Sequence, residues 1–277
     1  MSECGLTNLA VCLPEKFFEY ILSIFNAPLE PLLNLTKNLM SESVNIMLFH
    51  SFWAVIVYVI SLFYGLFFMF AGVNFIISGY DAVKRENAKQ WLRDIVLMVL
   101  FIQASFFIYA LLIDLSARLT GGVLDIIPSD FFLLHAQGVA DFGLQLIMLL
   151  PYLLVLVITI IFLGLRYLLV SIGVVLFPLA IFFYFIPPLK SYGKLILNIL
   201  VMTIFITFFN AVILFGASQL MLIPIYQNVS IFLTISAFFT LDLLMIFALL
   251  FGIIKSVFSV LDSDIGRNVT RAIKYLV

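Results

Sequence analysis

The feature that most constrains this chain is its long apolar runs, the longest of which extends almost unbroken from Phe142 to Pro187. One run of about 20 apolar residues crosses the hydrocarbon core of a bilayer as a helix. A water-soluble domain carries roughly 25% charged residues, whereas this chain carries 10%, alongside 65% hydrophobic residues. The charged residues are too few to cover a solvated surface. The sequence therefore predicts an all-α, polytopic membrane protein.

About six transmembrane helices are expected from the lengths of these runs. The run between Phe142 and Pro187 is long enough for two of them, which we expect to turn near Gly164 and Arg166. The other four are expected over residues 46–78, 95–115, 195–223 and 229–254. The chain then divides into an N-terminal segment 1–45, a transmembrane domain 46–254 and a C-terminal tail 255–277.

Both flanking segments are amphipathic. In residues 14–45, apolar residues recur at helical spacing on either side of Pro28, which predicts two short helices lying in the membrane interface. The tail from Lys255 onward has an apolar face and a basic face. The apolar face holds Leu261, Ile265, Val269, Ile273 and Leu276, and the basic face holds Arg267, Arg271 and Lys274.

Three glycines, Gly65, Gly72 and Gly79, recur every seven residues along the first expected span. This spacing keeps them on one helix face, where a neighbouring backbone can approach closely. The neighbour is either a helix of this chain, the interpretation that we favour, or a helix of another subunit.

A short charged connector, residues 81–94, separates the first two expected spans. In helical form it would carry Arg85, Lys89 and Arg93 on one face, with Trp91 suited to the headgroup level. The connector is either a docking surface, including one for phosphate groups, or a loop whose charges set the topology. Its basic residues are Lys84, Arg85, Lys89 and Arg93.

Asp242 falls near the midpoint of the last expected span. A carboxylate at that depth costs about 3 kcal/mol unless it is paired, protonated or hydrated. Arg166 is a possible partner if it lies at membrane depth, although we expect it to cap a helical hairpin at the headgroups. Other polar residues interrupt the apolar runs and either line an aqueous path or join helices by hydrogen bonds. They are Asp114, Gln103, Asn210 and Asp141.

The two cysteines, Cys4 and Cys12, both precede the first expected span. If the N-terminus faces an oxidising exterior, these two thiols can form a disulfide. In a reducing environment they would instead be small apolar residues at the membrane surface.

Catalytic motifs are absent from the sequence. His50 and His135 are the only histidines, and no HExxH, GxGD or Walker A motif occurs. The segment Gly216-Ala217-Ser218 is similar to a rhomboid nucleophile, but no histidine follows it in the chain. We expect no catalytic residues, cofactor or metal, so that any energy for transport would come from another protein.

Two stretches together resemble the TrbL-type membrane subunit of conjugation and type IV secretion systems. In the first, from Ser61 to Leu115, a span ends in a G-x-x-x-x-x-S-G run and a basic connector leads into a second span. In the second, LGLRYLLVSIGVVLFPLAIFFYFIPPLKSYGKLILN, an arginine opens a span that carries F-P-L-A and ends in a proline pair before K-x-x-x-K. The N-terminal CGLTNLAVC and the NAPLEPLLNL segment resemble archaeal CedA-type proteins of DNA import.

The resemblance implies a subunit that supports a DNA-translocation pore or a pilus-assembly platform in the plasma membrane. Its implied partners are a pilin-like small membrane protein, a HerA-type ATPase and DNA in transit, and an oligomer of the subunit is a further arrangement that the resemblance implies. The net charge of −1 gives no general affinity for nucleic acid. With few intramembrane cations, we expect the chain to support a conduit rather than to form one alone.

A stand-alone transporter for a small solute or ion, with Asp242 as its coupling site, is the competing hypothesis. Basic residues near the membrane are balanced between the two sides, so charge alone does not set the orientation. The cysteines and the resemblance favour extracytoplasmic termini and a cytoplasmic connector, whereas the basic C-terminal face favours the reverse.

Overall fold

The computed structural model describes residues 9–80, 82–133, 139–227 and 229–262. Every regular element in these residues is helical, which confirms the all-α class. Five helical segments are long and apolar enough to cross a membrane, which supports a multi-pass membrane protein. They are Ile46–Ile77, Ala82–Leu124, Leu146–Phe185, Pro187–Met221 and Ser230–Ala248.

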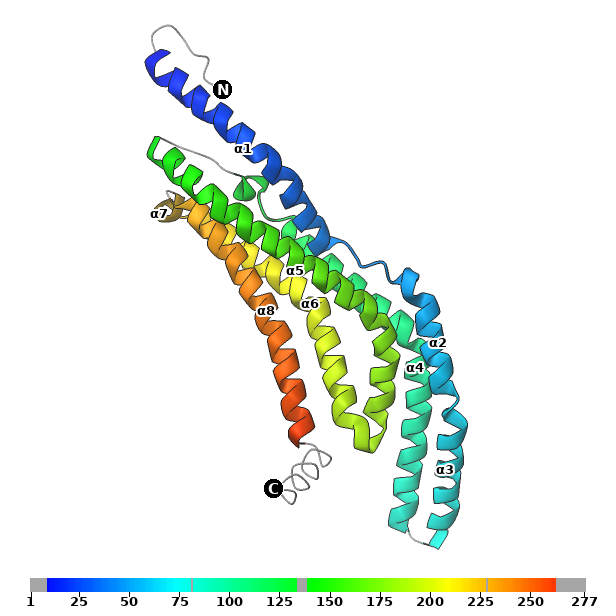
Figure 1. Cartoon of the computed structure of the whole chain (residues 1–277). Helices are drawn as coiled ribbons and strands as arrows, with labels where there is room; N and C mark the ends of the chain where they lie inside the picture. The colour runs from blue at the N-terminus through cyan, green and yellow to red at the C-terminus, as the bar shows by residue number, and fades with distance from the viewer. Residues whose placement is uncertain (1–8, 81, 134–138, 228, 263–277) are drawn as a thin grey trace, which may run out of the picture. The chain divides into compact units, whose positions relative to one another are not determined.

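Figure 1 shows the order of the helices along the chain. The α-helices are α1 (Leu9–Ser41), α2 (His50–Ser61), α3 (Tyr64–Ile77), α4 (Ala82–Leu124), α5 (Val139–Phe185), α6 (Lys190–Met221), α7 (Pro224–Gln227) and α8 (Ser230–Asp262). Short 3-10 turns occupy Ile46–Phe49, Ser78–Tyr80, Ser129–Phe132 and Pro187–Leu189. In lipid each helix satisfies its own backbone hydrogen bonds, which is why apolar segments take this form throughout.

The expected turn near Gly164 and Arg166 is wrong, because α5 continues through both residues as one helix of 47 residues. A single glycine and a single arginine do not interrupt a helix that gains one backbone hydrogen bond per residue. The predicted end of this run at the proline pair is confirmed, since α5 stops at Phe185 and Pro187 opens a 3-10 turn.

The N-terminal segment also differs from the expectation of two short helices. It forms the single helix α1, which continues through Pro28. Proline removes only one backbone hydrogen bond, and a long helix can tolerate that loss when one face packs. Leu29, Leu33, Thr36 and Met40 form that buried face at helical spacing, so α1 packs on the rest of the protein.

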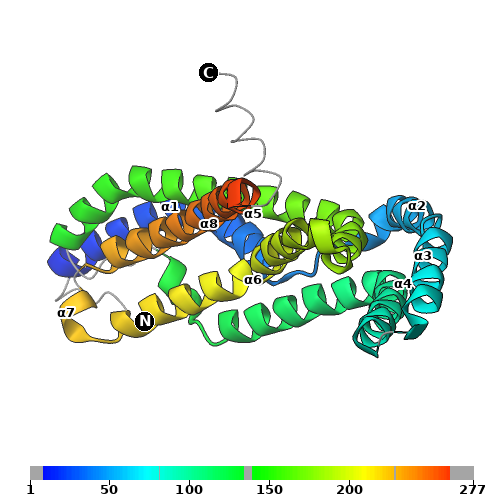
Figure 2. The same ribbon diagram turned by 90° about the horizontal axis from the view of Figure 1, so that it is seen from below.

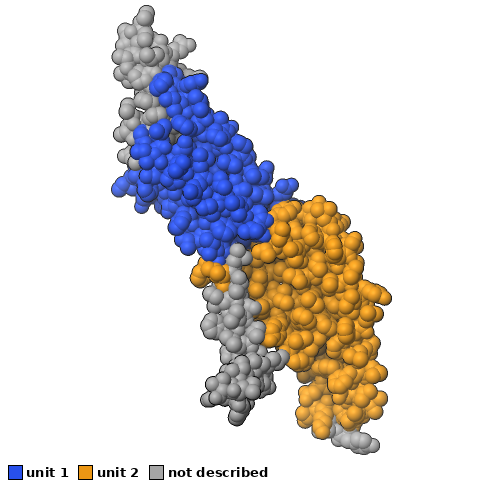
Figure 3. All heavy atoms as spheres, in the orientation of Figure 1, with its two compact units in different colours: residues 1–42, 116–166, 206–246 blue, residues 43–115, 167–205, 247–277 orange. Residues whose placement is uncertain are grey.

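The chain forms two compact units, each assembled from separate stretches of sequence (Figure 3). Unit 1 contains residues 1–42, 116–166 and 206–246, and unit 2 contains residues 43–115, 167–205 and 247–277. The long helices α4, α5, α6 and α8 each contribute residues to both units.

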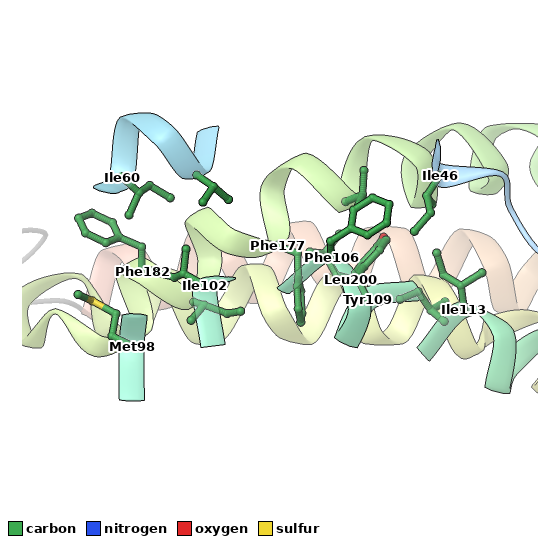
Figure 4. Packing of buried hydrophobic residues seen from close by; sticks show 14 of the residues in the cluster. Ile46, Ile60, Met98, Ile102, Phe106, Tyr109, Ile113, Phe177, Phe182 and Leu200 are labelled. Atoms are coloured by element: carbon green, nitrogen blue, oxygen red, sulfur yellow. The ribbon is translucent and has the colours of Figure 1, made fainter. Parts of the chain in front are cut away.

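Unit 2 has an aromatic and aliphatic core, shown in Figure 4. Phe106 and Tyr109 of α4 meet Phe177 of α5 and Leu200 of α6 in one buried cluster. The Tyr109 hydroxyl donates to the Val170 carbonyl oxygen at 2.7 Å, which satisfies the polar tip of a fully buried ring. The core is therefore apolar without leaving that hydroxyl unsatisfied.

Near the N-terminus of α4, helices α3 and α4 lie side by side in unit 2 (Figures 1 and 2). The rings of Phe70 on α3 and Trp91 on α4 pack edge to face, with centroids 5.0 Å apart. A hollow of about 340 Å³ lies beside this contact, lined in part by Asn74, Lys84 and Asn87.

Candidate functional site

The two units differ sharply in their buried polar side chains. Among the described residues of unit 2, the buried polar side chains are Ser78, Ser105 and Ser171, and each donates to a carbonyl oxygen three or four residues earlier. The interior of unit 1 is more polar. Its buried polar residues are Thr36, Ser116, Thr120, Thr159, Arg166, Thr207, Asn210, Ser218, Thr234 and Asp242.

Most hydroxyl groups inside unit 1 are satisfied locally. Thr36, Thr120, Thr159 and Thr234 donate to the carbonyl oxygen four residues earlier, at 2.7–3.1 Å. This back-bonding is open to serine and threonine because their hydroxyls lie close to the helix backbone. Asparagine, aspartate and arginine side chains need partners beyond their own backbone turn, so Asn210, Asp242 and Arg166 are the informative residues.

Asp242 lies on α8 with 5% of its surface exposed, as its position in an apolar span predicts. Its carboxyl group is hydrogen-bonded to Thr159 of α5, and its Oδ1 atom has no hydrogen-bond partner in the described chain. Thr159 also donates to the Val155 carbonyl oxygen at 3.0 Å. The Thr159 hydroxyl is therefore engaged with its own helix, and the Asp242 carboxyl group is incompletely satisfied.

Asn210 of α6 is fully buried, and neither its Nδ2 nor its Oδ1 atom has a hydrogen-bond partner among the described residues. α6 and α8 follow one another through the short connection 222–229. In such an antiparallel pair, moving one turn towards the N-terminus of α6 and one turn towards the C-terminus of α8 reaches the same level along the pair. Leu214 and Phe238 line the same cavity, Asn210 precedes Leu214 by four residues, and Asp242 follows Phe238 by four. Asn210 and Asp242 therefore occupy the same level.

The contact between Thr159 and Asp242 was not anticipated from the sequence. The signal that was present is a regular buried stripe on α5, in which Tyr152, Leu156, Thr159, Leu163 and Arg166 alternate at spacings of four and three. A threonine in such a stripe faces the interior of the unit. Without the tertiary structure, the helix opposite this stripe is unknown.

Arg166 is buried, with 6% of its surface exposed, in the middle of α5. Because α5 continues through Arg166, the expectation that this residue caps a helical hairpin is wrong. It lies two turns of α5 beyond Thr159, about 10 Å along the helix axis. The contact seen for Asp242 is with Thr159 rather than with Arg166.

Asp114 does not belong to this polar interior. It lies on an exposed face of α4 and in unit 2, whereas Ser116 and Thr120 of the same helix are buried. Gln103 is exposed as well, and the side chain of Asp141 lies outside the described part. Of the polar residues singled out in the sequence, the structure brings Asn210 to the level of Asp242.

A cavity of about 290 Å³ in unit 1 lies one turn from that level. Leu214 and Phe238 form its side nearest Asn210 and Asp242, while Glu30, Asn34 and Lys37 of α1 supply polar groups. Lys37 forms an ion pair with Asp125 at 3.4 Å. Side chains of α1, α6 and α8 thus line one cavity.

The basic connector is the beginning of α4 rather than a loop, because the helix starts at Ala82. The expected stripe is confirmed in its geometry, since Arg85, Lys89 and Arg93 lie four residues apart on a helix and are exposed. Lys89 pairs with Glu86 and Arg93 with Asp94, each at 3.7 Å. Lys84 lines the hollow beside Trp91.

Cys4 lies outside the described residues, as does the side chain of Cys12, so the structure does not bear on their disulfide. His50 packs with Trp53 and Phe106, at ring-centroid distances of 5.3 and 5.0 Å. It is part of an aromatic cluster. Within the described part of the chain, no group of three or more His, Cys, Asp or Glu side chains is arranged to hold a metal ion.

The site that emerges is a small polar group on three helices of unit 1: Thr159 on α5, Asn210 on α6 and Asp242 on α8. It offers one carboxylate, one amide and one hydroxyl, in an apolar bundle, beside a cavity. No protein-family model, curated protein or solved structure matches the chain.

Proposed function

We propose that this protein is a multi-pass membrane subunit of a type IV secretion-like apparatus that translocates DNA or assembles pili. In this role it supports a transmembrane pore together with other subunits. The TrbL-like features between Ser61 and Leu115 and between Leu163 and Asn198 motivate the choice of system. The multi-pass helical architecture is compatible with it.

The observation that carries the proposal is the open glycine face of α3 and the turn that follows it. A Cβ atom built at Gly65, Gly72 or Gly79 meets nothing within 4 Å. The interpretation favoured from the sequence, packing of this face against another helix of the same chain, is therefore not met by any helix of the described residues. A period-seven glycine face in a membrane helix is suited to close approach by another helix, and we assign that helix to a partner subunit.

The charge inside the protein supports a role beside the pore rather than as the whole pore. Arg166 is the one buried cation in the described residues, whereas duplex DNA carries one negative charge per about 1.7 Å of its axis. DNA passage would therefore need surfaces from other subunits. The exposed stripe Arg85, Lys89 and Arg93 at the start of α4 is a suitable docking place for an ATPase in the cytoplasm.

The proposal includes a membrane and an orientation. The protein lies in the plasma membrane, and the start of α4 faces the cytoplasm. The expectation that both termini lie outside the cell depended on six spans. Five single crossings would instead place the residues before Ile46 and those after Ala248 on opposite sides.

Affinity purification from gently solubilised membranes tests the proposed function. We expect a HerA-type ATPase and a pilin-like small membrane protein to co-purify with the tagged chain. Deletion of the gene should abolish DNA transfer or pilus formation. Normal transfer after deletion, with no motor ATPase recovered from cross-linked membranes, would refute the proposal.

A stand-alone transporter is the second candidate, favoured by the buried Asp242 and its contact with Thr159. It requires the purified protein alone to move a solute or ion across liposomes. Substitution Asp242→Asn should then stop the flux while the protein stays folded. A secretion subunit predicts instead that the purified chain conducts nothing by itself.

A further inference from the structure

Asp242 presents a carboxylate that the protein satisfies only in part. Its Oδ1 atom has no hydrogen-bond partner in the described chain, and its Thr159 partner also donates to Val155. Buried charges in proteins are paired with other charges or coordinate metal ions. A carboxylate at this position therefore requires a positive charge or a proton.

Asn210 has the matching deficiency on the neighbouring helix. Both polar atoms of its amide lack partners within the described residues although the side chain is fully buried. An amide N–H group and a carboxylate at the same level would normally form a hydrogen bond with each other. Neither atom is so engaged in the described chain, so both side chains offer an oxygen atom that is free to bind a third group.

We propose that Asp242, Asn210 and Thr159 bind a small monovalent cation, sodium being the ion that fits their chemistry. Carboxylate, amide carbonyl and hydroxyl oxygens are hard ligands of the kind that hard cations prefer. One carboxylate charge matches one monovalent charge, so that the occupied site is neutral in the apolar bundle. The ion accepts the lone pairs of the Asp242 Oδ1 and Asn210 Oδ1 atoms, for which the described residues supply no donor.

The cavity beside the site provides its access. Leu214 and Phe238 separate the cavity by one helical turn from Asn210 and Asp242. Glu30 and Asn34 line the same cavity from α1, and both offer oxygen atoms to an entering cation. The ion thus reaches the site from the side of the unit covered by α1.

Cation binding goes beyond the proposed secretion function, and it would deepen the transporter alternative by naming the coupled ion. The two questions are separable, because binding is measured at equilibrium without any flux. If the chain binds sodium but conducts nothing in liposomes, the proposed cation site stands and the transporter hypothesis is refuted.

Thermal unfolding and equilibrium dialysis of the purified full-length chain in detergent test this proposal. Sodium chloride replaces choline chloride at constant ionic strength, and ²²Na⁺ is the dialysis probe. We expect sodium at tenfold its dissociation constant to raise the midpoint of unfolding by about 3–6 °C. Dialysis should show one bound ion per chain.

Asp242→Asn should abolish both signals while leaving the protein folded in choline chloride, since it removes the buried charge and keeps the shape. Asn210→Leu, which is similar in size and lacks the ligand oxygen, should weaken sodium binding at least tenfold. Asp114→Asn is the matched control, because that carboxylate is exposed on α4, and it should retain the full shift.

Equal midpoints of the native protein in sodium and choline, with no retained ²²Na⁺, would overturn the proposal. A sodium shift that persists in Asp242→Asn would also overturn it, because binding would then lie elsewhere. If Asp242→Asn does not fold, Asn210→Leu and Asp114→Asn decide the matter by dialysis, and equal sodium affinity in these two variants refutes the site.

Discussion

Polar side chains inside this protein fall into two classes by how their hydrogen bonds are satisfied. A serine or threonine hydroxyl donates to the carbonyl oxygen of its own helix, as Ser171 and Thr120 do at 2.9 and 2.7 Å. Such a residue needs nothing from a neighbouring helix. The amide of Asn210 and the carboxyl of Asp242 have no such option, and they therefore carry information about function.

The packing of unit 2 leaves no space for a side chain at Gly173. A Cβ atom there would overlap the Tyr109 hydroxyl and the Leu200 side chain. Gly173→Ala should displace the Tyr109 ring, break its hydrogen bond to Val170 and lower the free energy of unfolding by about 1–3 kcal/mol. Denaturant unfolding in mixed micelles measures this loss.

The matched control for this substitution is Gly164→Ala, on the same helix, where a Cβ atom meets nothing within 4 Å. Alanine is the better helix former by about 1 kcal/mol, so this variant should be as stable as the native chain or more stable. Equal effects of the two substitutions would contradict the packing described around Tyr109.

At the scale of single elements, α3 and α5 show what the local sequence determines about a helix and what its neighbouring helices determine. The heptad spacing of the glycines on α3 predicted a close contact but not its partner. α5 shows the reverse case, because its glycine and arginine suggested a turn where the helix in fact continues. In both cases the local sequence indicates a helix, and the neighbouring helices determine where it ends and what it contacts.

Gly72→Leu tests the open face of α3. Nothing lies within 4 Å of the position, so we expect the free energy of unfolding to change by less than about 0.5 kcal/mol, as at an ordinary surface site. Association with the partner subunit should nevertheless fall at least tenfold, because leucine keeps the partner helix from approaching closely. Cross-linking in native membranes measures this association.

Gly216→Leu is the control for this variant, since Gly216 of α6 is equally open and lies outside the glycine face. It should leave the association unchanged. A Gly72→Leu chain that cross-links normally would show that α3 faces lipid only.

At the scale of the whole molecule, five helical segments are long and apolar enough to cross a membrane. The continuous helix α5 occupies the stretch in which two spans were expected, so topologies with five and with six crossings differ there. The change of unit also falls at residue 166. The sequence signal at Gly164 and Arg166 thus marks a boundary between units rather than a turn.

Cysteine accessibility distinguishes these topologies. In a chain with Cys4 and Cys12 replaced by serine, Leu165→Cys should resist membrane-impermeant maleimide on both sides, because mid-helix residues of a continuous span face lipid or protein. Gln90→Cys, exposed near the start of α4, should react from one side. Rapid labelling of Leu165→Cys from the aqueous phase would restore the hairpin and the six-span count.

By itself, the sequence determined the all-α membrane class, the approximate place of most spans and the helical basic stripe at the start of α4. These features depend on local hydropathy and periodicity, because a helix in lipid closes its hydrogen bonds within itself. The sequence also marked Asp242 as costly, since a carboxylate in an apolar span loses its hydration and needs a partner, a proton or water to offset that loss.

Only the tertiary structure decided that Asn210 shares the level of Asp242, that Thr159 contacts it, and that Asp114 is exposed. It also decided that Gly65 and Gly72 of α3 have no atom of the described chain within 4 Å of where a Cβ atom would lie. These facts depend on how helices far apart in sequence pack and in which register. Apolar faces specify such packing weakly, because many leucine, isoleucine and phenylalanine surfaces fit one another about equally well.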